Sequence, residues 1–202
     1  MADSPVQLVV GLGNPGPRYA DTRHNAGFWF ADDLAYRCAA AFRRAPKFLG
    51  DLAEAQWGGR FWLLKPETFM NRSGASVGAL ARFYRLSAPQ ILVVHDDLDL
   101  PPGAVRVKRG GGHGGHNGLR DVMAQLGDRE FLRLRIGIGH PGNSDQVVDY
   151  VLTRAPREEQ DLIEQAITQA VDVFPHILEG NLDKAMNLLH RRPQGAGSGG
   201  QG

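Results

Sequence analysis

Two stretches of the chain carry side chains suited to proton transfer near neutral pH. His24 lies twelve residues after the first predicted strand, and Asp96 lies at or near the end of the apolar run at 91–94. A carboxylate that orients an imidazole fixes its tautomer and stabilises the imidazolium that forms, which is the usual arrangement of a general base. The same pair could serve a structural purpose alone. The sequence therefore gives a candidate acid–base pair.

The sequence contains no motif for a nucleophilic side chain. It lacks the G-x-S-x-G elbow of serine hydrolases, and its one cysteine, Cys38, falls on a predicted buried helix face. If acyl chemistry occurs here, we expect water activated by histidine to attack. A metal could activate that water, but the spacing of the possible ligands matches neither a helical zinc pair nor a calcium loop, so we expect no metal. The possible ligands are His95, Asp96, Asp97, Asp99, His113, His116 and His140.

The segment 11–16 has the G-x-G-x-x-G spacing of a dinucleotide-binding loop. Pro15 and Pro17 remove amide donors where a pyrophosphate would need them, and the acidic residues at 32–33 fall on a predicted helix. The segment therefore predicts a tight turn and no nucleotide cofactor. Asn14 remains at the carboxyl end of the first strand, where its amide could bind a peptide-like group or simply form the turn.

The segment 108–118 is a second glycine-rich loop, with six glycines in eleven residues. Ordering such a loop costs backbone entropy, so we expect it to approach a ligand closely or to move. Basic residues lie around it although the net charge of the chain is only +1, and a local basic face suits a polyanion held at one place. They are Arg106, Lys108, Arg109, Arg120, Arg133 and Arg135.

Short apolar runs alternate with stretches of helical periodicity, which predicts an α/β fold. We expect one domain over residues 1–192: a three-layer sandwich whose twisted central sheet is mixed but largely parallel, with helices on both faces. Pro156 begins the clearest helix, and Pro175 is expected to kink or end it. The glycine-rich tail at 193–202 is predicted to be disordered. The predicted strands are 6–12, 51–57, 61–64, 91–94, 105–108 and 134–138, and the earlier predicted helices are 28–42, 77–84 and 119–126.

Composition restricts the classes to which the chain can belong. With 42% hydrophobic residues it is typical of a globular protein, and its apolar runs are too short to span a bilayer. Residues 1–5 lack the charged and apolar regions of a secretory signal. A single cysteine excludes an internal disulfide and fits a reducing compartment. We therefore expect a cytoplasmic protein that has no membrane contact.

Six motifs, in the family's own order, resemble bacterial peptidyl-tRNA hydrolase, and the resemblance covers residues 6–192. The motifs are GLGNPG at 11–16, TRHNAGF at 22–28, KPETFMNRSG at 65–74, HDDLDLPPG at 95–103, GGGHGGHNGL at 110–119 and RLRIGIGHP at 133–141. The resemblance implies hydrolysis of the ester between a peptide and the 3′-terminal ribose of tRNA, which recycles tRNA from stalled translation. It implies a monomer with no metal, no cofactor and no obligate protein partner.

The resemblance also implies roles for individual residues. His24 would be the general base, and Asp96 would hold it in its basic form. Asn14 would distinguish an N-blocked, peptide-like substrate from free aminoacyl-tRNA. An amide of Asn14, Asn71 or Asn117 could donate to the oxyanion, and the sequence does not decide among them. The tRNA end and the peptide would be bound by Tyr19, Phe69, Asn71 and Asn117, with Met70 and His116 beside them and with Lys108 and Arg135 on phosphate.

One departure from the family pattern bears on tRNA binding. Some relatives carry a lysine after the HPG turn, where this chain has GNSD at 142–145, which predicts weaker or more salt-sensitive binding there. An alternative function is an RNA-binding protein on the same scaffold that has lost catalysis. The presence of His24, Asp96 and the three asparagines argues against that alternative. Release of an N-acetylated amino acid from tRNA would distinguish the two.

Overall fold

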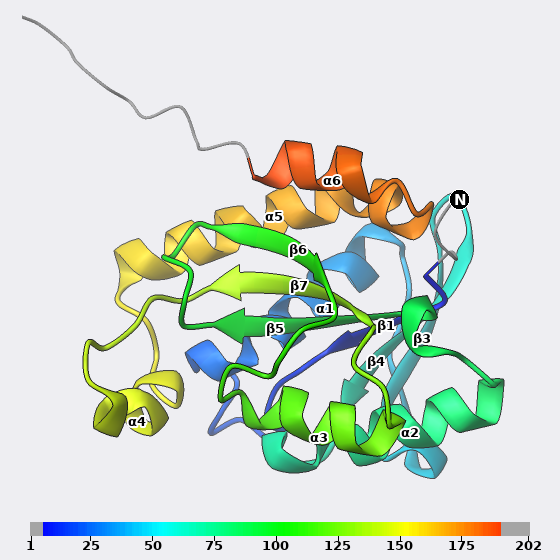
Figure 1. The fold of residues 1–202 in the computed structure, drawn as a ribbon, viewed down its shortest axis with the longest axis horizontal. Coiled ribbons are helices and arrows are strands. Elements are labelled where there is room, and N and C mark those ends of the chain that lie inside the picture. Colours follow the sequence, from blue (N-terminus) through cyan, green and yellow to red (C-terminus); the bar gives the residue numbers. More distant parts are fainter. Residues whose placement is uncertain (1–5, 191–202) are drawn as a thin grey trace, which may run out of the picture.

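A seven-stranded sheet forms the middle layer of the molecule (Figure 1). The structure, a computed structural model, describes residues 6–190. The predicted tail at 193–202 and the predicted domain end at 192 lie outside this range. The strands are β1 (Leu8–Gly11), β2 (Arg43–Ala45), β3 (Gly50–Gln56), β4 (Arg60–Pro66), β5 (Ile91–Asp97), β6 (Val105–Arg109) and β7 (Leu132–Gly137), and their order across the sheet is β2-β3-β4-β1-β5-β7-β6.

The four central strands, β4, β1, β5 and β7, are parallel to one another. β2, β3 and β6 run antiparallel to their neighbours, so the sheet is mixed and largely parallel, as predicted. β1 and the first four residues of β5 are continuous apolar runs because both of their faces are covered, whereas β7 carries Arg133 and Arg135 among its apolar residues. Parallel strands bring their carboxyl ends to one edge of the sheet, which is where α/β proteins bind ligands. A short helix, α4 (Val147–Val151), lies beyond this edge (Figure 1).

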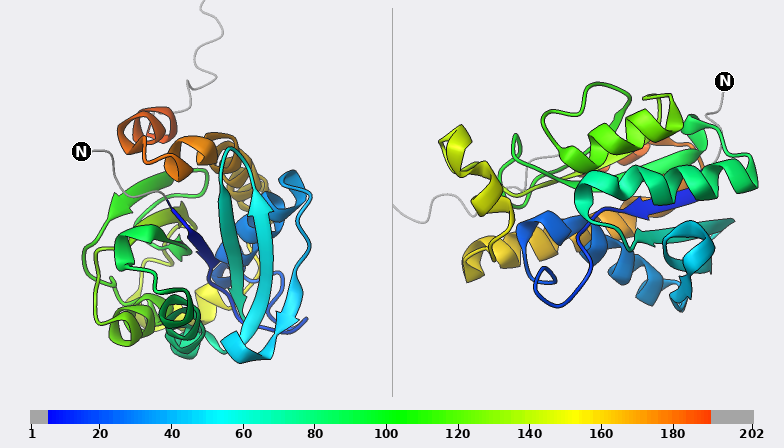
Figure 2. Two further views of the ribbon diagram at one scale, coloured as in Figure 1. Left: turned by 90° about the vertical axis from the view of Figure 1, so that its right-hand side faces the viewer. Right: turned by 90° about the horizontal axis from the view of Figure 1, so that it is seen from below.

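Helices cover both faces of the sheet and complete the three layers, as two further views show (Figure 2). One face packs against α1 (Ala26–Arg37), α5 (Arg157–Leu178) and α6 (Leu182–Leu189). The other face packs against α2 (Ser73–Tyr84) and α3 (Asn117–Leu126). No helix within residues 6–190 combines the length and the apolar character that crossing a membrane requires. Short 3₁₀ turns lie at Arg23–Asn25, Pro46–Phe48, Met70–Arg72, Ala88–Gln90 and Ser144–Gln146.

Both edges of the sheet are protected against pairing with another strand. Helix α6 packs along the edge strand β6, and the backbone N–H of Val107 donates to Nε2 of His190 at 3.3 Å. The opposite edge strand, β2, carries the exposed side chains of Arg43 and Arg44. A covering helix and charged side chains are two ways in which proteins prevent a strand from adding to an edge.

Some local predictions need correction. Of the two outcomes expected at Pro175, an end of the helix does not occur: α5 continues to Leu178, because the side chains of its last turn are buried against the core and offset the hydrogen bond that proline cannot make. Helix α1 ends at Arg37, earlier than predicted, because Ala39 takes a left-handed conformation with φ of 50°. Cys38 therefore lies at the end of the helix, where it is only half-buried although it still packs against the core.

Candidate active site

A cleft of about 940 Å³ opens at the carboxyl edge of the sheet. Its walls come from the segments after β1 and β4, from β5, β6 and β7, from the start of α3 and from α4. Every residue to which the sequence assigned a place in the site lines this one cleft. These residues are Asn14, Tyr19, His24, Phe69, Met70, Asn71, Asp96, Lys108, His116, Asn117 and Arg135.

Asp96, near the end of β5, is only 3% exposed and contacts two histidines. Its Oδ1 and Oδ2 lie 3.0 and 2.9 Å from Nδ1 of His24, and Oδ1 lies 2.9 Å from Nε2 of His116. His24 comes from the 3₁₀ turn before α1, and His116 comes from the end of the glycine-rich loop. A buried carboxylate needs such donors because an unpaired buried charge is costly. The structure therefore places the candidate pair in contact and adds His116 as a second partner.

The backbone fixes which nitrogen of His116 carries a proton. Its Nδ1 accepts hydrogen bonds from the N–H groups of Gly118 and Leu119, 3.1 and 3.3 Å away, at the N-terminus of α3. The proton must then sit on Nε2, which donates it to Asp96. Asp96 also accepts from Nδ1–H of His24. Nε2 of His24 is therefore the nitrogen with a free lone pair, and it has no hydrogen-bond partner among residues 6–190.

The surroundings of Asp96 shift the pKa values of the site. Burial alone would raise the pKa of Asp96, but His24 and His116 outweigh it and hold that pKa well below its usual range. Burial opposes protonation of His24, but the Asp96 carboxylate outweighs it and raises the pKa of His24 above its ordinary value. Burial lowers the pKa of the neighbouring His95 to about 4. The buried carboxylate therefore favours the protonated form of His24, which is the form that a general base reaches when it takes a proton.

His24, Asp96 and His116 each have one possible metal-ligand atom, and these three atoms lie within 4.8 Å of one another, close enough to share a metal ion. His116 does not suit that role, because its Nε2 carries the proton while its Nδ1 accepts from the backbone. Metal binding at Nε2 would require either an imidazolate or the loss of both backbone hydrogen bonds. The donor set fits a hydrogen-bonded acid–base cluster better than a metal centre.

Asn14, just after β1, is held by three hydrogen bonds. Its backbone N–H donates to Oδ1 of Asn25 at 2.8 Å, and its C=O accepts from Nδ2 of Asn25 at 2.9 Å. Its side-chain Oδ1 accepts from the backbone N–H of Met70 at 2.7 Å. That hydrogen bond fixes which end of the amide is the oxygen, and Asn14 lines the cleft with its Nδ2 hydrogens not otherwise bonded within residues 6–190. Asn14 can therefore donate to a ligand.

The segment after β4 forms one wall of the cleft together with Tyr19. Phe69 is 58% exposed, and its ring lies edge-on to that of Tyr19 with 6.2 Å between centroids. Met70 is buried against the start of α3, where a Cβ added at Gly118 would come within 2.5 Å of its Sδ. Asn71 lines the cleft beside them. The wall combines exposed aromatic surface with amide groups, which suits a base or a peptide main chain.

The basic side chains at the cleft differ in how free they are. Lys108, on β6, is exposed, and no hydrogen bond or ion pair holds its ammonium within the described part of the chain. Arg135, on β7, donates from Nε to Oδ2 of Asp97 at 2.7 Å. Part of its charge is therefore already compensated, so Lys108 carries more of the attraction toward an anion.

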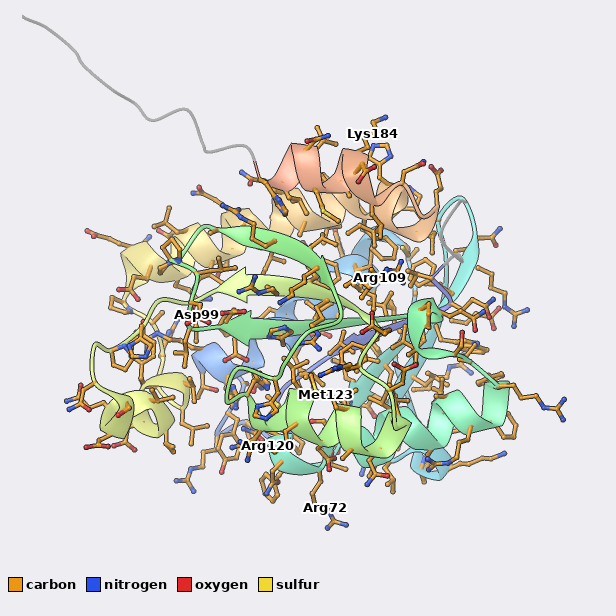
Figure 3. All side chains as sticks on the ribbon, in the orientation of Figure 1. Arg72, Asp99, Arg109, Arg120, Met123 and Lys184 are labelled. Carbon is orange, nitrogen blue, oxygen red and sulfur yellow. The ribbon has the colours of Figure 1, made fainter. Side chains whose placement is uncertain are left out.

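Arg133 has a structural role that the charge pattern did not show. It is 3% exposed and donates to the carbonyl groups of Gly111 and Gly112 at 2.6 and 2.5 Å, so it fixes the glycine-rich loop. Arg109 does not line the cleft. Figure 3 shows Arg109 toward one end of the sheet and Asp99, which does line the cleft, at the other.

A family model described as peptidyl-tRNA hydrolase matches residues 8–196. The chain belongs to the peptidyl-tRNA hydrolase family. It is 54% identical to the peptidyl-tRNA hydrolase of Methylobacillus flagellatus over 187 aligned residues, and this alignment covers 93% of this chain and 97% of that protein. It is 52% identical to the peptidyl-tRNA hydrolase of Azoarcus sp. over 193 aligned residues, and this alignment covers 96% of this chain and 88% of that protein.

Solved structures of peptidyl-tRNA hydrolase have the same fold. The crystal structure from Acinetobacter baumannii matches with a TM-score of 0.89 and 46% identity, over 94% of this chain and 95% of that chain. A complex of peptidyl-tRNA hydrolase with N-propanol matches with a TM-score of 0.91 and 45% identity, over 94% and 97%. The peptidyl-tRNA hydrolase resemblance of the six motifs and the predicted fold class are both confirmed.

Sequence reasoning missed three contributions to this peptidyl-tRNA hydrolase cleft. Asn25 fixes the backbone of Asn14, and its place beside His24 in the second motif was the available signal. Arg133 fixes the glycine-rich loop, and a charged residue inside an apolar strand was the signal there. The apolar wall supplied by α4 was missed although Val147, Val148, Val151 and Leu152 have helical spacing and Asn143 caps the preceding turn, because the apolar stretch is too short to indicate a helix by itself.

Proposed function

We propose that the chain hydrolyses the ester bond between a peptide and the 3′-terminal ribose of tRNA, and so recycles tRNA from stalled translation. The membership of the peptidyl-tRNA hydrolase family supports the substrate and the reaction. The observation that carries the mechanism is the contact between Nδ1 of His24 and both oxygens of Asp96, which leaves Nε2 of His24 able to accept a proton.

In the proposed reaction, His24 is the general base and water is the nucleophile. Nε2 of His24 takes a proton from water as the water oxygen attacks the ester carbonyl carbon. The resulting imidazolium is stabilised by the buried carboxylate of Asp96. When the tetrahedral intermediate collapses, the bond to the ribose oxygen breaks and that oxygen takes the proton from His24. The products are a peptide with a free carboxyl group and a tRNA with a free 3′-hydroxyl.

Asn14 supplies the donor for the developing negative charge. The N–H of Met70 fixes the position of the Asn14 Oδ1, and the Asn14 Nδ2 hydrogens are left to donate to a ligand. A fixed donor of this kind stabilises an oxyanion, and Asn71 and Asn117 add amide groups to the same cleft. The same donor disfavours a free aminoacyl-tRNA, because a charged ammonium offers only hydrogens and leaves the amide hydrogens unpaired. N-blocked substrates are therefore preferred.

Lys108 and Arg135 bind phosphate groups at the acceptor end of the tRNA. Contacts of this kind position the duplex without reading its sequence. Tyr19 and Phe69 stack on the unpaired tRNA end or on the peptide, and Met70 and His116 shape the cleft beside them. The protein works as a cytoplasmic monomer without a metal or cofactor, and its protected sheet edges support the monomer.

The decisive assay compares the release of N-acetylated and free amino acid from tRNA, with and without a chelator. The wild-type chain should release the N-acetylated residue much faster, and the chelator should have no effect. His24→Ala should abolish turnover while tRNA binding stays within a factor of about two, since His24 is not placed on phosphate. His176→Gln, on α5 and away from the cleft, is the matched control.

Each outcome separates the proposal from its rivals. Binding of tRNA without release of any amino acid by the wild-type chain would favour the inactive RNA-binding protein. Loss of activity on chelation would favour a metal-activated water. Normal hydrolysis by His24→Ala would refute the assignment of the base, although the ester hydrolase itself would stand.

A further inference from the structure

Arg23, the residue before His24, links the base-bearing turn to the far side of the cleft. Its side chain is nearly buried, with 5% exposed. Nη1 donates to the C=O of Tyr150 at 3.0 Å and to Oγ1 of Thr153 at 2.9 Å, and Nη2 lies 3.4 Å from Oε2 of Glu159. The backbone N–H of Arg23 also donates to the C=O of Thr153 at 3.1 Å. Backbone and side chain thus join the turn to the end of α4 and to α5.

Tyr150 extends this link to the sheet. The guanidinium carbon of Arg23 lies 3.9 Å from the centre of the Tyr150 ring, which is a close cation–π contact. The hydroxyl of Tyr150 donates to the C=O of Ile138, just after β7, at 2.6 Å. A planar guanidinium can stack face-on against a ring while its separate N–H groups donate in fixed directions, whereas the compact ammonium of a lysine has neither the plane nor the fork. The arrangement therefore suits arginine better than lysine.

Helix α4 needs such a link because its own sequence does not favour a helix. It has five residues, VVDYV, far fewer than an isolated helix requires, and three of the five are β-branched valines. Nevertheless Val147 and Val151 line the cleft together with His24. Contacts with the rest of the protein must therefore set the position of α4, and the contacts of Arg23 and Tyr150 join it to the base-bearing turn and to the sheet.

We propose that Arg23 is a positioning residue that fixes the apolar α4 wall relative to His24, and so determines how the esterified end of the substrate is held beside the base. Arg23 acts through α4 and does not change the protonation of His24, whose own partner is Asp96. The proposal rests on the proposed role of His24. If the guanidinium contacts of Arg23 are lost, α4 should open more often and substrate should bind more weakly, while the pH dependence of turnover stays the same.

The test is Arg23→Lys, which keeps a cation near Glu159 but loses the fork. Amide hydrogen exchange in 147–153 should become faster while exchange in β5 is unchanged, because only the local opening of α4 is affected. KM for an N-acetylated aminoacyl-tRNA should rise about tenfold, with a smaller change in kcat and an unshifted pH profile. Arg154→Lys is the matched control, since its side chain is 73% exposed and lies 3.9 Å from Asp21, and it should leave both readouts unchanged.

Tyr150→Leu removes the ring and the hydroxyl but leaves the ion pair of Arg23 with Glu159, so it tests the link even if Arg23→Lys fails to fold. It should reproduce both effects, and the double variant should add little because both changes break one link. Unchanged exchange in 147–153 would overturn the proposal, as would a shifted pH profile or fully additive effects. Hydrogen exchange needs no substrate, so failure of this proposal is distinguishable from failure of the proposed function.

Discussion

Replacing Asp96 with asparagine should place the proton of His24 on the wrong nitrogen. In the wild-type protein both oxygens of Asp96 accept from Nδ1–H of His24, and Oδ1 also accepts from Nε2–H of His116. An asparagine has one oxygen and one NH2 group in their place. The proton of His116 cannot move, since its Nδ1 accepts from the backbone of α3, so the asparagine oxygen must face His116. The NH2 group then takes the place of Oδ2, 2.9 Å from Nδ1 of His24, and favours the tautomer whose proton is on Nε2.

The cost of this reversal follows from what Nε2 does in the proposed reaction. An Nε2 that carries a proton cannot take one from water, and turnover requires the rare opposite tautomer. In hydrolases with a Ser-His-Asp triad the same substitution lowers kcat by about 10⁴-fold, which is roughly 5 kcal/mol of lost transition-state stabilisation. We expect a loss of about 10³ to 10⁴-fold for Asp96→Asn. The pKa of His24 should also fall, because the carboxylate that raises it is gone.

Single-turnover hydrolysis of an N-acetylated aminoacyl-tRNA between pH 5 and 9 measures both effects. Activity should rise with pH as His24 loses its proton, and in Asp96→Asn this rise should occur at lower pH and reach a far lower plateau. Binding of uncharged tRNA reports whether the cleft is intact. Asp128→Asn is the matched control, because within residues 6–190 the Asp128 carboxylate accepts from the backbone N–H of Glu130 alone. More than a tenth of wild-type kcat in Asp96→Asn would refute the tautomer argument.

Three further predictions test other parts of the cleft. Asn14→Asp keeps an oxygen for the N–H of Met70 but replaces the donor with an acceptor, and kcat should fall by about 10²- to 10³-fold with tRNA binding retained; a kcat near the wild-type value would exclude Asn14 as the donor. Lys108→Ala should raise KM, spare kcat and flatten the plot of log affinity against log salt by about 0.9, and an unchanged slope would remove Lys108 from the phosphate contacts. Because burial lowers the pKa of His95 to about 4, the unfolded chain binds a proton below about pH 6.5 that the folded protein does not. The free energy of unfolding in urea should therefore fall between pH 6.5 and 4, by up to about 3 kcal/mol, and His95→Asn should remove that part of the pH dependence.

The sequence predicted the central sheet well because its strands are buried on both faces. Apolar runs such as the one at 91–94 leave little ambiguity, and their alternation with helical patterns indicates an α/β fold. The exceptions have local physical causes. Strand β2 consists of Arg43–Ala45 and carries no apolar alternation, because it is an edge strand whose exposed side chains discourage pairing. Helix α4 is set by contacts with Arg23 and Tyr150 that are remote in sequence.

The members of the site could be predicted from motifs, but their hydrogen-bond roles could not. The motifs named Asn14, His24 and Asp96, and the topology explains why they meet, since β1 and β5 are neighbours and end at one edge of the sheet. Which side of the Asn14 amide faces a ligand depends on the N–H of Met70, which comes from another segment. The tautomer of His116 likewise depends on its position at the start of α3. Both depend on contacts between segments that are distant in sequence.

The bond between Val107 and His190 has a practical consequence for shortened versions of the protein. Deleting the chain from Leu182 onward would remove the helix that covers the edge strand β6. The deletion would expose backbone amide groups of β6 and the apolar surface beneath α6. Two such molecules could then pair their sheets edge to edge, and we expect the shortened chain to self-associate more than the intact one in size-exclusion chromatography. Expression designs should therefore keep His190 and cut, if at all, beyond it.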